Sequence, residues 1–176
     1  MRCSKCGCPL FKGEIMCPDC LTPVTKGDTM AATTIKIKLD PNAKAQIVPK
    51  VNVNGDWIDL YIMEPINLKA GEDVRVSLGV AMELPPGYEA HILPRSSMFE
   101  KTGLLLTNSM GMIDNSYNGN DDYWSAHVYA TRDVNVEAGT RLFQFRIEKN
   151  QPDVKFELVT ELTNKNRGGY GSTGTT

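Results

Sequence analysis

The chain has 176 residues, of which 41% are hydrophobic, and 19 Lys plus Arg against 21 Asp plus Glu give a formal charge of −2. This size and apolar content predict one globular core and exclude fibrous, disordered and two-domain enzyme classes. The negative charge disfavours a core that wraps duplex nucleic acid, because phosphate binding needs a basic face. No apolar run approaches the roughly 18 residues of a membrane span, and the chain does not start with a secretory signal, so we expect a cytoplasmic protein without a membrane partner.

All five cysteines fall within the first 20 residues. Cys3/Cys6 and Cys17/Cys20 have the Cys-x-x-Cys spacing whose sulfurs converge on one tetrahedral Zn²⁺. Disulfides and a redox pair are the alternatives, but an odd cysteine count and the lack of an export signal disfavour disulfides. We therefore expect structural zinc on Cys3, Cys6, Cys17 and Cys20, with Cys8 either spare or replacing Cys6.

The segment that holds these cysteines resembles the short zinc ribbons. We expect a zinc-ribbon-like module over residues 1–24, which needs metal because so short a segment buries too little apolar area to fold alone. Residues 25–33 are polar and aperiodic and indicate a linker. The role of the module is open: it binds a protein partner, contacts a nucleic-acid end, or caps the particle.

Apolar residues recur at every second position from Thr34 onward, which is the period of a strand with one buried face. No stretch of ten residues has a convincing helical period, so we expect an all-β core, a sandwich or barrel, over residues 34–163. The alternating sets are Ile35/Ile37/Leu39, Ile58/Leu60/Ile62, a long run from Val74 to Leu84, His127/Tyr129 or Val128, Val134/Val136, Phe143/Phe145/Ile147 and Val154/Phe156/Leu158.

Five local patches carry more specific information than this periodicity. They are Asp59-Leu60, Pro94-Arg95-Ser96-Ser97, the segment from Gly111 to Gly119, Gly139 to Gln144, and Arg167 to Gly174. In this order, over residues 34–174, they resemble the trimeric dUTPases, which hydrolyse dUTP to dUMP and pyrophosphate, keeping uracil out of DNA and supplying dUMP. The resemblance implies a jelly-roll or β-barrel sandwich, a homotrimer and Mg²⁺ bound with the triphosphate.

The Gly111–Gly119 patch implies the catalytic residue. By resemblance Asp114 is the general base that holds the attacking water, whereas alone it would be interpreted as a turn cap; such bases typically contribute about 10² to 10⁴ in rate. The resemblance also implies that Tyr117 packs on the deoxyribose and excludes a 2′-hydroxyl. Uracil is then read by Asn108 and by the hairpin backbone at Met112 and Ile113.

Phosphate contacts are implied for Arg95, Ser96, Ser97 and Gln144, while Arg141 is partly structural. Asp59 is assigned either to waters around Mg²⁺ or to a structural role, because only the Asp-Leu pair of its patch matches. The phosphates and water should hold most of the Mg²⁺ coordination. Thr140 and Phe143 depart from the family pattern.

The Gly-rich end, residues 164–176, resembles a lid arm that closes over a site between other subunits. Arg167 is the expected phosphate contact, with Lys165 as the alternative. The resemblance also implies that Tyr170 stacks on the uracil ring. The backbone of Gly171 and the hydroxyls of Ser172 and Thr173 would surround the phosphates.

Two other functions compete with this interpretation. A dCTP deaminase shares the Arg-Ser-Ser patch but lacks the Ile-Asp-x-x-Tyr hairpin, which this chain has. A dUTPase-like protein could instead add a regulatory or partner-binding role through the cysteine module. Elsewhere we expect Asp121 and Asp122 in a solvated turn, Trp124 in the core or an interface, and His91 and His127 packed in strands.

Overall fold

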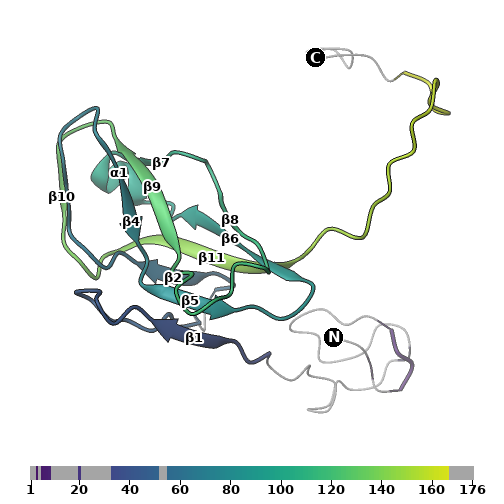
Figure 1. The fold of residues 1–176 in the computed structure, drawn as a ribbon, viewed down its shortest axis with the longest axis horizontal. Helices are drawn as coiled ribbons and strands as arrows, with labels where there is room; N and C mark the ends of the chain where they lie inside the picture. The colour runs from purple at the N-terminus through teal and green to yellow at the C-terminus, as the bar shows by residue number, and fades with distance from the viewer. Residues whose placement is uncertain (1–2, 4, 9–19, 21–32, 52–54, 167–176) are drawn as a thin grey trace.

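The structure is a computed structural model, and it describes residues 3, 5–8, 20, 33–51 and 55–166. Short strands dominate these residues, as Figure 1 shows. In chain order the elements are β1 (Lys36–Leu39), β2 (Ile58–Tyr61), β3 (Ile66–Leu68), β4 (Asp73–Ser77), β5 (Val80–Glu83), β6 (Tyr88–Pro94), α1 (Met98–Thr102), β7 (Leu104–Leu106), β8 (Gly111–Ile113), β9 (Ser125–Ala130), β10 (Val134–Val136) and β11 (Arg141–Lys149).

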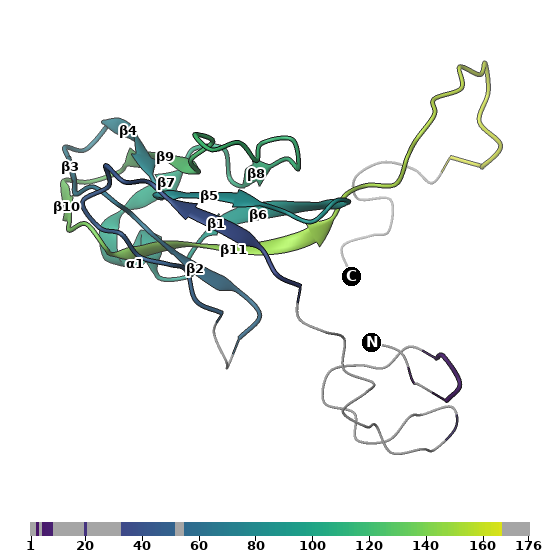
Figure 2. The same cartoon turned by 60° about the horizontal axis from the view of Figure 1, so that its bottom comes forward.

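The strands pair antiparallel in four sheets. The largest has the order β2-β11-β6-β8, the next β4-β9-β7, and β1-β5 and β10-β3 form two-stranded sheets. β11 and β6 are the two inner strands of the largest sheet: β11 pairs with β2 and β6, and β6 pairs with β11 and β8. The all-β prediction is confirmed, and the two-stranded β1-β5 sheet lies along one face of the body (Figure 2).

Aromatic packing anchors the core. Trp124 is fully buried, and its ring meets that of Phe145 edge to face at a centroid distance of 5.2 Å. Its backbone is held as well, because Trp124 N donates to Val80 O at 2.8 Å and Leu78 N donates to Trp124 O at 2.9 Å. Trp124 is therefore the core aromatic that the sequence predicted. Phe143, the departure from the family pattern, is also fully buried.

The expected long alternating run from Val74 to Leu84 is interrupted at Gly79. The residue has φ +65°, and a Cβ built there would lie 2.3 Å from Met63 Cγ, so only glycine fits this close approach. The run is thereby divided into β4 and β5, which belong to different sheets. One amphipathic pattern in the sequence thus supplies two sheets.

The predicted strand at Val154, Phe156 and Leu158 is wrong. Residues 150–166 form no strand, and these three side chains are 58%, 93% and 100% exposed. The segment leaves the end of β11 and extends away from the sheets (Figures 1 and 2). Alternation alone does not make a strand, because the backbone needs a neighbouring strand for its hydrogen bonds.

Helix is confined to α1 in the described residues. It begins after Ser97, whose carbonyl accepts a hydrogen bond from Lys101 N at 3.1 Å, and it ends at Gly103 with φ +73°. No helix in these ranges is long and apolar enough to cross a membrane.

Candidate active site

Asp114 comes directly after β8 and is exposed. Its Oδ1 accepts two hydrogen bonds from Ser116, one from the hydroxyl at 2.5 Å and one from the backbone N–H at 2.8 Å. The hydroxyl first, and then the backbone amide, lower the pKa of Asp114 below its ordinary value. The carboxylate is therefore ionised at neutral pH, and among the described residues Oδ2 receives no hydrogen bond.

Asp114 opens a loop over residues 114–124, which we call the 114–124 loop. Asn115 holds its start, because its Nδ2 donates to Leu84 O at 3.3 Å and to Pro85 O at 3.0 Å. Trp124, buried in the core, holds its end. Between the two anchors most residues are exposed, so the loop presents its side chains to solvent.

Tyr117 is the accessible aromatic of this loop, with 41% of its surface exposed. Its backbone N–H donates to Asp114 O at 3.0 Å, and its hydroxyl donates to Tyr123 O at 3.3 Å. The first bond closes a tight turn that keeps Tyr117 beside the carboxylate. The aromatic face remains available to a ligand.

Gly119 closes the turn after Tyr117 through a backbone hydrogen bond. Its N–H donates to Asp122 Oδ2 at 2.6 Å, and a Cβ there would lie 2.8 Å from the same oxygen. The prediction of a solvated acidic turn is confirmed for Asp121, whose side chain is 92% exposed. Asp122 has the additional task of holding the loop backbone.

β8 is the edge strand of its sheet within the described residues, because it pairs with β6 alone. One side of its backbone therefore has hydrogen-bonding groups without a strand partner, which suits the reading of a planar base. Asn108 precedes this strand in a turn where Ser109 has φ +61°. Asn108 and Gly111 line a cavity of about 160 Å³ together with Arg75, Thr107 and His127.

A second cluster of predicted residues lies at one end of β2, β6 and β11. Arg95 Nε lies 2.9 Å from Asp59 Oδ1, and Arg141 Nη1 lies 3.0 Å from Asp59 Oδ2. Gln144 Nε2 donates to Pro94 O at 3.2 Å, and Arg95 N donates to Leu142 O at 2.9 Å. Asp59 thus orients two guanidinium groups, which makes it a structural partner of the arginines in this structure.

The two serines that follow Arg95 have different settings. Ser96 is exposed, whereas Ser97 is partly buried where α1 begins. Arg95 O accepts a hydrogen bond from Met98 N at 2.9 Å, so the turn between β6 and α1 holds both serines next to the arginine.

The strand register places Asp114 and Arg95 far apart. Ile113 faces Ala90 on β6, and Arg95 lies five residues beyond Ala90, directly after β6 ends at Pro94. At about 3.3 Å per residue, this is a separation of roughly 16 Å along the strand. The structure therefore brings Asp59, Arg95 and Gln144 together, and brings Met112, Ile113, Asp114 and Tyr117 together, but does not bring the two clusters together in one chain.

Three residues that lie in the 114–124 loop or contact it had no role predicted from the sequence. Ser116 was recognisable in principle, because Asp-x-Ser is a pattern in which the aspartate side chain caps a turn. Asn115, which anchors the loop to Pro85, and Lys38, whose Nζ donates to Asn120 O, reach residues distant in the sequence and have no local signal. Arg141 was expected to be partly structural, and its ion pair with Asp59 fits that interpretation.

Three described cysteines lie together near the N-terminus. The sulfur atoms of Cys3, Cys6 and Cys20 all lie within 4.8 Å of one another, and those of Cys3 and Cys20 are 3.7 Å apart. Gly7 has φ +74°, and its N–H donates to Cys3 O at 2.9 Å, which curls the chain into a knuckle. A sulfur separation of 3.7 Å is too long for a disulfide, whose bond is about 2.05 Å.

Six predicted residues lie outside the described ranges: Cys17, Arg167, Tyr170, Gly171, Ser172 and Thr173. The lid arm over 164–176 and the fourth zinc ligand therefore stay predictions, as do the boundaries of the module and linker. His91 and His127 lie in β6 and β9, as expected. Each pairs with a carboxylate at 2.6 Å, His91 with Glu89 and His127 with Asp73.

Within the described residues, fold and site together define an all-β protein with an ionised carboxylate beside an exposed aromatic, a strand edge without a partner strand, and two arginines paired with Asp59. A dUTPase family model matches residues 57–176. The SPbeta prophage-derived deoxyuridine 5′-triphosphate nucleotidohydrolase of Bacillus subtilis is 53% identical over 121 residues, which cover 69% of this chain and 85% of that protein. The chain belongs to the dUTPase family.

Two solved structures show the same fold. A variant of the dUTPase of Staphylococcus bacteriophage 80alpha, solved with dUpNHpp, has a TM-score of 0.67 at 19% identity, with 81% of this chain and 99% of that chain covered. A dUTPase variant from phage phi11 of S. aureus, described with a structural Mg(II) ion, has a TM-score of 0.62 at 18% identity, with 73% and 98% covered. The family match and the nucleotidohydrolase relative do not favour the alternative of a dCTP deaminase.

Proposed function

We propose that this protein hydrolyses dUTP to dUMP and pyrophosphate. The observation that carries this function is the Asp114 carboxylate, held ionised by Ser116 beside the exposed Tyr117. Membership of the dUTPase family and the 53% identical nucleotidohydrolase support the same reaction. The reaction takes place at the start of the 114–124 loop, directly after β8.

Asp114 acts as the general base. Its Oδ2 takes a proton from water, the water oxygen bonds to the α-phosphorus, and the bond from that phosphorus to the bridging oxygen of the β-phosphate breaks. Pyrophosphate leaves with the electron pair, and the proton passes from Asp114 to solvent. Ser116 keeps Oδ1 occupied, so Oδ2 is the oxygen that meets the water.

Base and sugar are read by the strand edge and the tyrosine. Backbone groups of Met112 and Ile113 on the free side of β8, with the Asn108 side chain, pair with uracil. Cytosine presents an amino donor where uracil has a carbonyl, and sites built on such pairing reject mismatches by up to roughly 10⁴ to 10⁵. The Tyr117 ring packs on the deoxyribose and leaves no space for a 2′-hydroxyl.

The phosphates are bound by Arg95, Ser96, Ser97 and Gln144. Both carboxylate oxygens of Asp59 are occupied by guanidinium groups, so Asp59 fits an indirect role through water better than a direct metal bond. The triphosphate and water hold most of the Mg²⁺ coordination, because Mg²⁺ keeps much of its hydration and takes few protein ligands. When bound, Mg²⁺ neutralises phosphate charge and favours departure of pyrophosphate.

The working unit is a homotrimer in which one chain supplies Asp114 and another supplies Arg95. This arrangement is supported by the separation of the two clusters along β6, since one chain cannot place both on a single α-phosphate. The exposed side chains of Val154, Phe156 and Leu158 support it too, because burying this apolar surface against a second copy is favourable. The lid arm, with Arg167 or Lys165 on the phosphates, closes the site from a third chain.

The N-terminal cysteines bind one structural Zn²⁺. Tetrahedral coordination with Zn–S bonds of about 2.3 Å places sulfurs about 3.8 Å apart, close to the 3.7 Å between Cys3 and Cys20. Cys3, Cys6 and Cys20 provide three thiolates, and Cys17 is the predicted fourth. The Zn²⁺ ion would hold the module folded. A protein partner for residues 1–24 stays a prediction.

A nucleotide panel tests the main proposal. With Mg²⁺, the protein should release pyrophosphate from dUTP far faster than from dCTP, dTTP or UTP. Replacing Tyr117 with Ala should bring the rate with UTP closer to that with dUTP, because the ring no longer excludes the 2′-hydroxyl, whereas Tyr117→Phe should keep the discrimination. Equal rates across the panel for the unaltered protein would refute the proposed specificity.

A further inference from the structure

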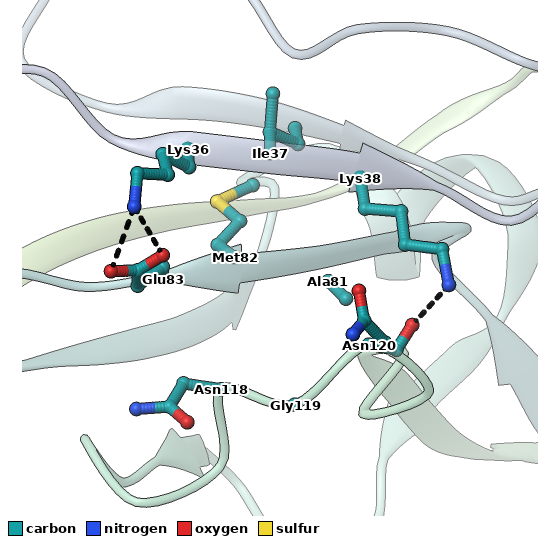
Figure 3. A pocket seen from close by; sticks show the side chains of 9 residues that line it. All are labelled: Lys36, Ile37, Lys38, Ala81, Met82, Glu83, Asn118, Gly119 and Asn120. Atoms are coloured by element: carbon teal, nitrogen blue, oxygen red, sulfur yellow. Dashed lines mark hydrogen bonds and ion pairs between the residues drawn. The ribbon is translucent and has the colours of Figure 1, made fainter.

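A lysine on β1 reaches the 114–124 loop from outside its sheet. Lys38 Nζ donates to Asn120 O at 2.6 Å (Figure 3). The same nitrogen lies 3.4 Å from Asp121 Oδ1. Lys38 and Asn120 are 82 positions apart, so only the fold brings them together. The lysine side chain spans the pocket between β1, β5 and the loop, a cavity of about 280 Å³.

The Lys38 ammonium also lies close to Tyr123, near the end of the 114–124 loop. It lies 5.4 Å from the centroid of the Tyr123 ring, within the range of a cation–π interaction. Contacts with Tyr123 and then Asp121 raise the pKa of Lys38, so the group stays charged. Tyr123 O in turn accepts the hydrogen bond from the Tyr117 hydroxyl. A continuous set of contacts thus leads from β1 to the aromatic beside Asp114.

The contacts of Lys38 differ in strength. The ion pair with Asp121 is exposed, and such pairs contribute little. The hydrogen bond to Asn120 O has a charged donor and a short distance, which makes it the stronger contact. It acts on the middle of the loop, between the anchor at Asn115 and the anchor at Trp124, where the side chains are exposed.

Lys36 provides a natural comparison on the same strand. Its Nζ lies 2.9 Å from Glu83 Oε2 and 3.2 Å from Oε1, so it bridges β1 and β5 (Figure 3). Both side chains are largely exposed, and the contact does not involve the loop. The two lysines thus share residue type, strand and face, and differ in whether they touch the loop.

We propose that Lys38 is a positioning residue for dUTP hydrolysis: by binding Asn120 O it holds the 114–124 loop in the form that presents Tyr117 and Asp114 to the nucleotide. The inference rests on the proposed function of the loop. Its physical basis is that small displacements of groups around a reacting centre are costly, with about 1 Å worth up to about 10² in rate. β1 therefore serves the active site as well as the core.

The test compares Lys38→Met with Lys36→Met, since methionine keeps an apolar stem and removes the donor in both. Lys38→Met should lower kcat/KM for dUTP by roughly tenfold and weaken discrimination against UTP, because the loop is less well ordered. Lys36→Met should stay within about twofold of the unaltered protein, as expected for an exposed ion pair. Lys38→Arg, which retains a charged donor, should recover most of the loss.

Hydrogen exchange gives an independent readout. Peptides covering residues 114–124 should exchange faster in Lys38→Met and unchanged in Lys36→Met, with equal melting temperatures. Equal kinetics and equal exchange in the two methionine variants would overturn the proposal, as would a lower melting temperature in Lys38→Met with unaltered kcat/KM. If the unaltered protein did not hydrolyse dUTP, the proposed function would fail, while the exchange comparison would still decide whether Lys38 holds the loop.

Discussion

Ser116 binds Asp114 twice through the same carboxylate oxygen, with its hydroxyl at 2.5 Å and its backbone N–H at 2.8 Å. Because both bonds end on Oδ1, the other oxygen is left to face a water molecule. The same bonds stabilise the charged form, so the group is ionised when the nucleotide arrives.

Replacing Asp114 with Asn should lower kcat for dUTP by roughly 10² to 10⁴, because the amide cannot accept the proton. Binding of the analogue dUpNHpp, measured by calorimetry, should be largely retained. Asp133→Asn is the matched control. It removes an exposed carboxylate whose pKa is also lowered, by Lys69, but which lies between β9 and β10 away from the site. Loss of nucleotide binding in Asp114→Asn would show instead that the carboxylate holds the loop together.

Removing the Ser116 hydroxyl should shift the pH dependence of the reaction. A carboxylate with a lowered pKa stays ionised to lower pH, and activity is lost as pH falls through that pKa. Ser116→Ala removes the larger cause of the lowering, so the acidic limb of kcat/KM should move to higher pH while the rate near neutral pH changes little. If the acidic limb of the kcat/KM profile did not move in Ser116→Ala, a group other than Asp114 would control it.

Mixed trimers should reveal a site shared between chains. Asp114→Asn and Arg95→Ala should each be nearly inactive alone. Co-expressed in equal amounts with different tags and purified as mixed particles, they should regain about a third of the activity, since one of the three sites in each mixed trimer receives both intact residues from different chains. Activity no higher than that of the separate variants would place both residues in one chain's site, contrary to the register along β6.

Elemental analysis should find about one zinc per chain in protein purified without chelator. Cys3→Ser and Cys20→Ser should lose the metal, because each removes one of the clustered thiolates, whereas Cys8→Ser should retain it. Hydrolysis of dUTP should survive metal removal from this module, since the proposed catalytic groups lie in the β core. Retention of zinc in Cys3→Ser would identify a different ligand set.

Strands that bury one face could be predicted from the sequence alone, without knowing which strands they pair with. Period-two alternation identified the strands that contain Leu60, Val128 and Phe145, because each buries one face. The same rule failed at Val154, Phe156 and Leu158, where no strand in the described part of the chain pairs with the segment. It also failed to divide the Val74–Leu84 run, since the break at Gly79 comes from the close approach of Met63, which is 16 residues away.

The sequence by itself determined the all-β class, the identity of the chemical groups and their order along the chain, because strand periodicity and short motifs are properties of neighbouring residues. Only the tertiary structure decided which of these groups meet. It pairs Asp59 with Arg95 and Arg141, sets Asp114 at the other end of β6, and brings Lys38 to Asn120. Such contacts follow from sheet order and register, which depend on the packing of the whole core rather than on any one segment.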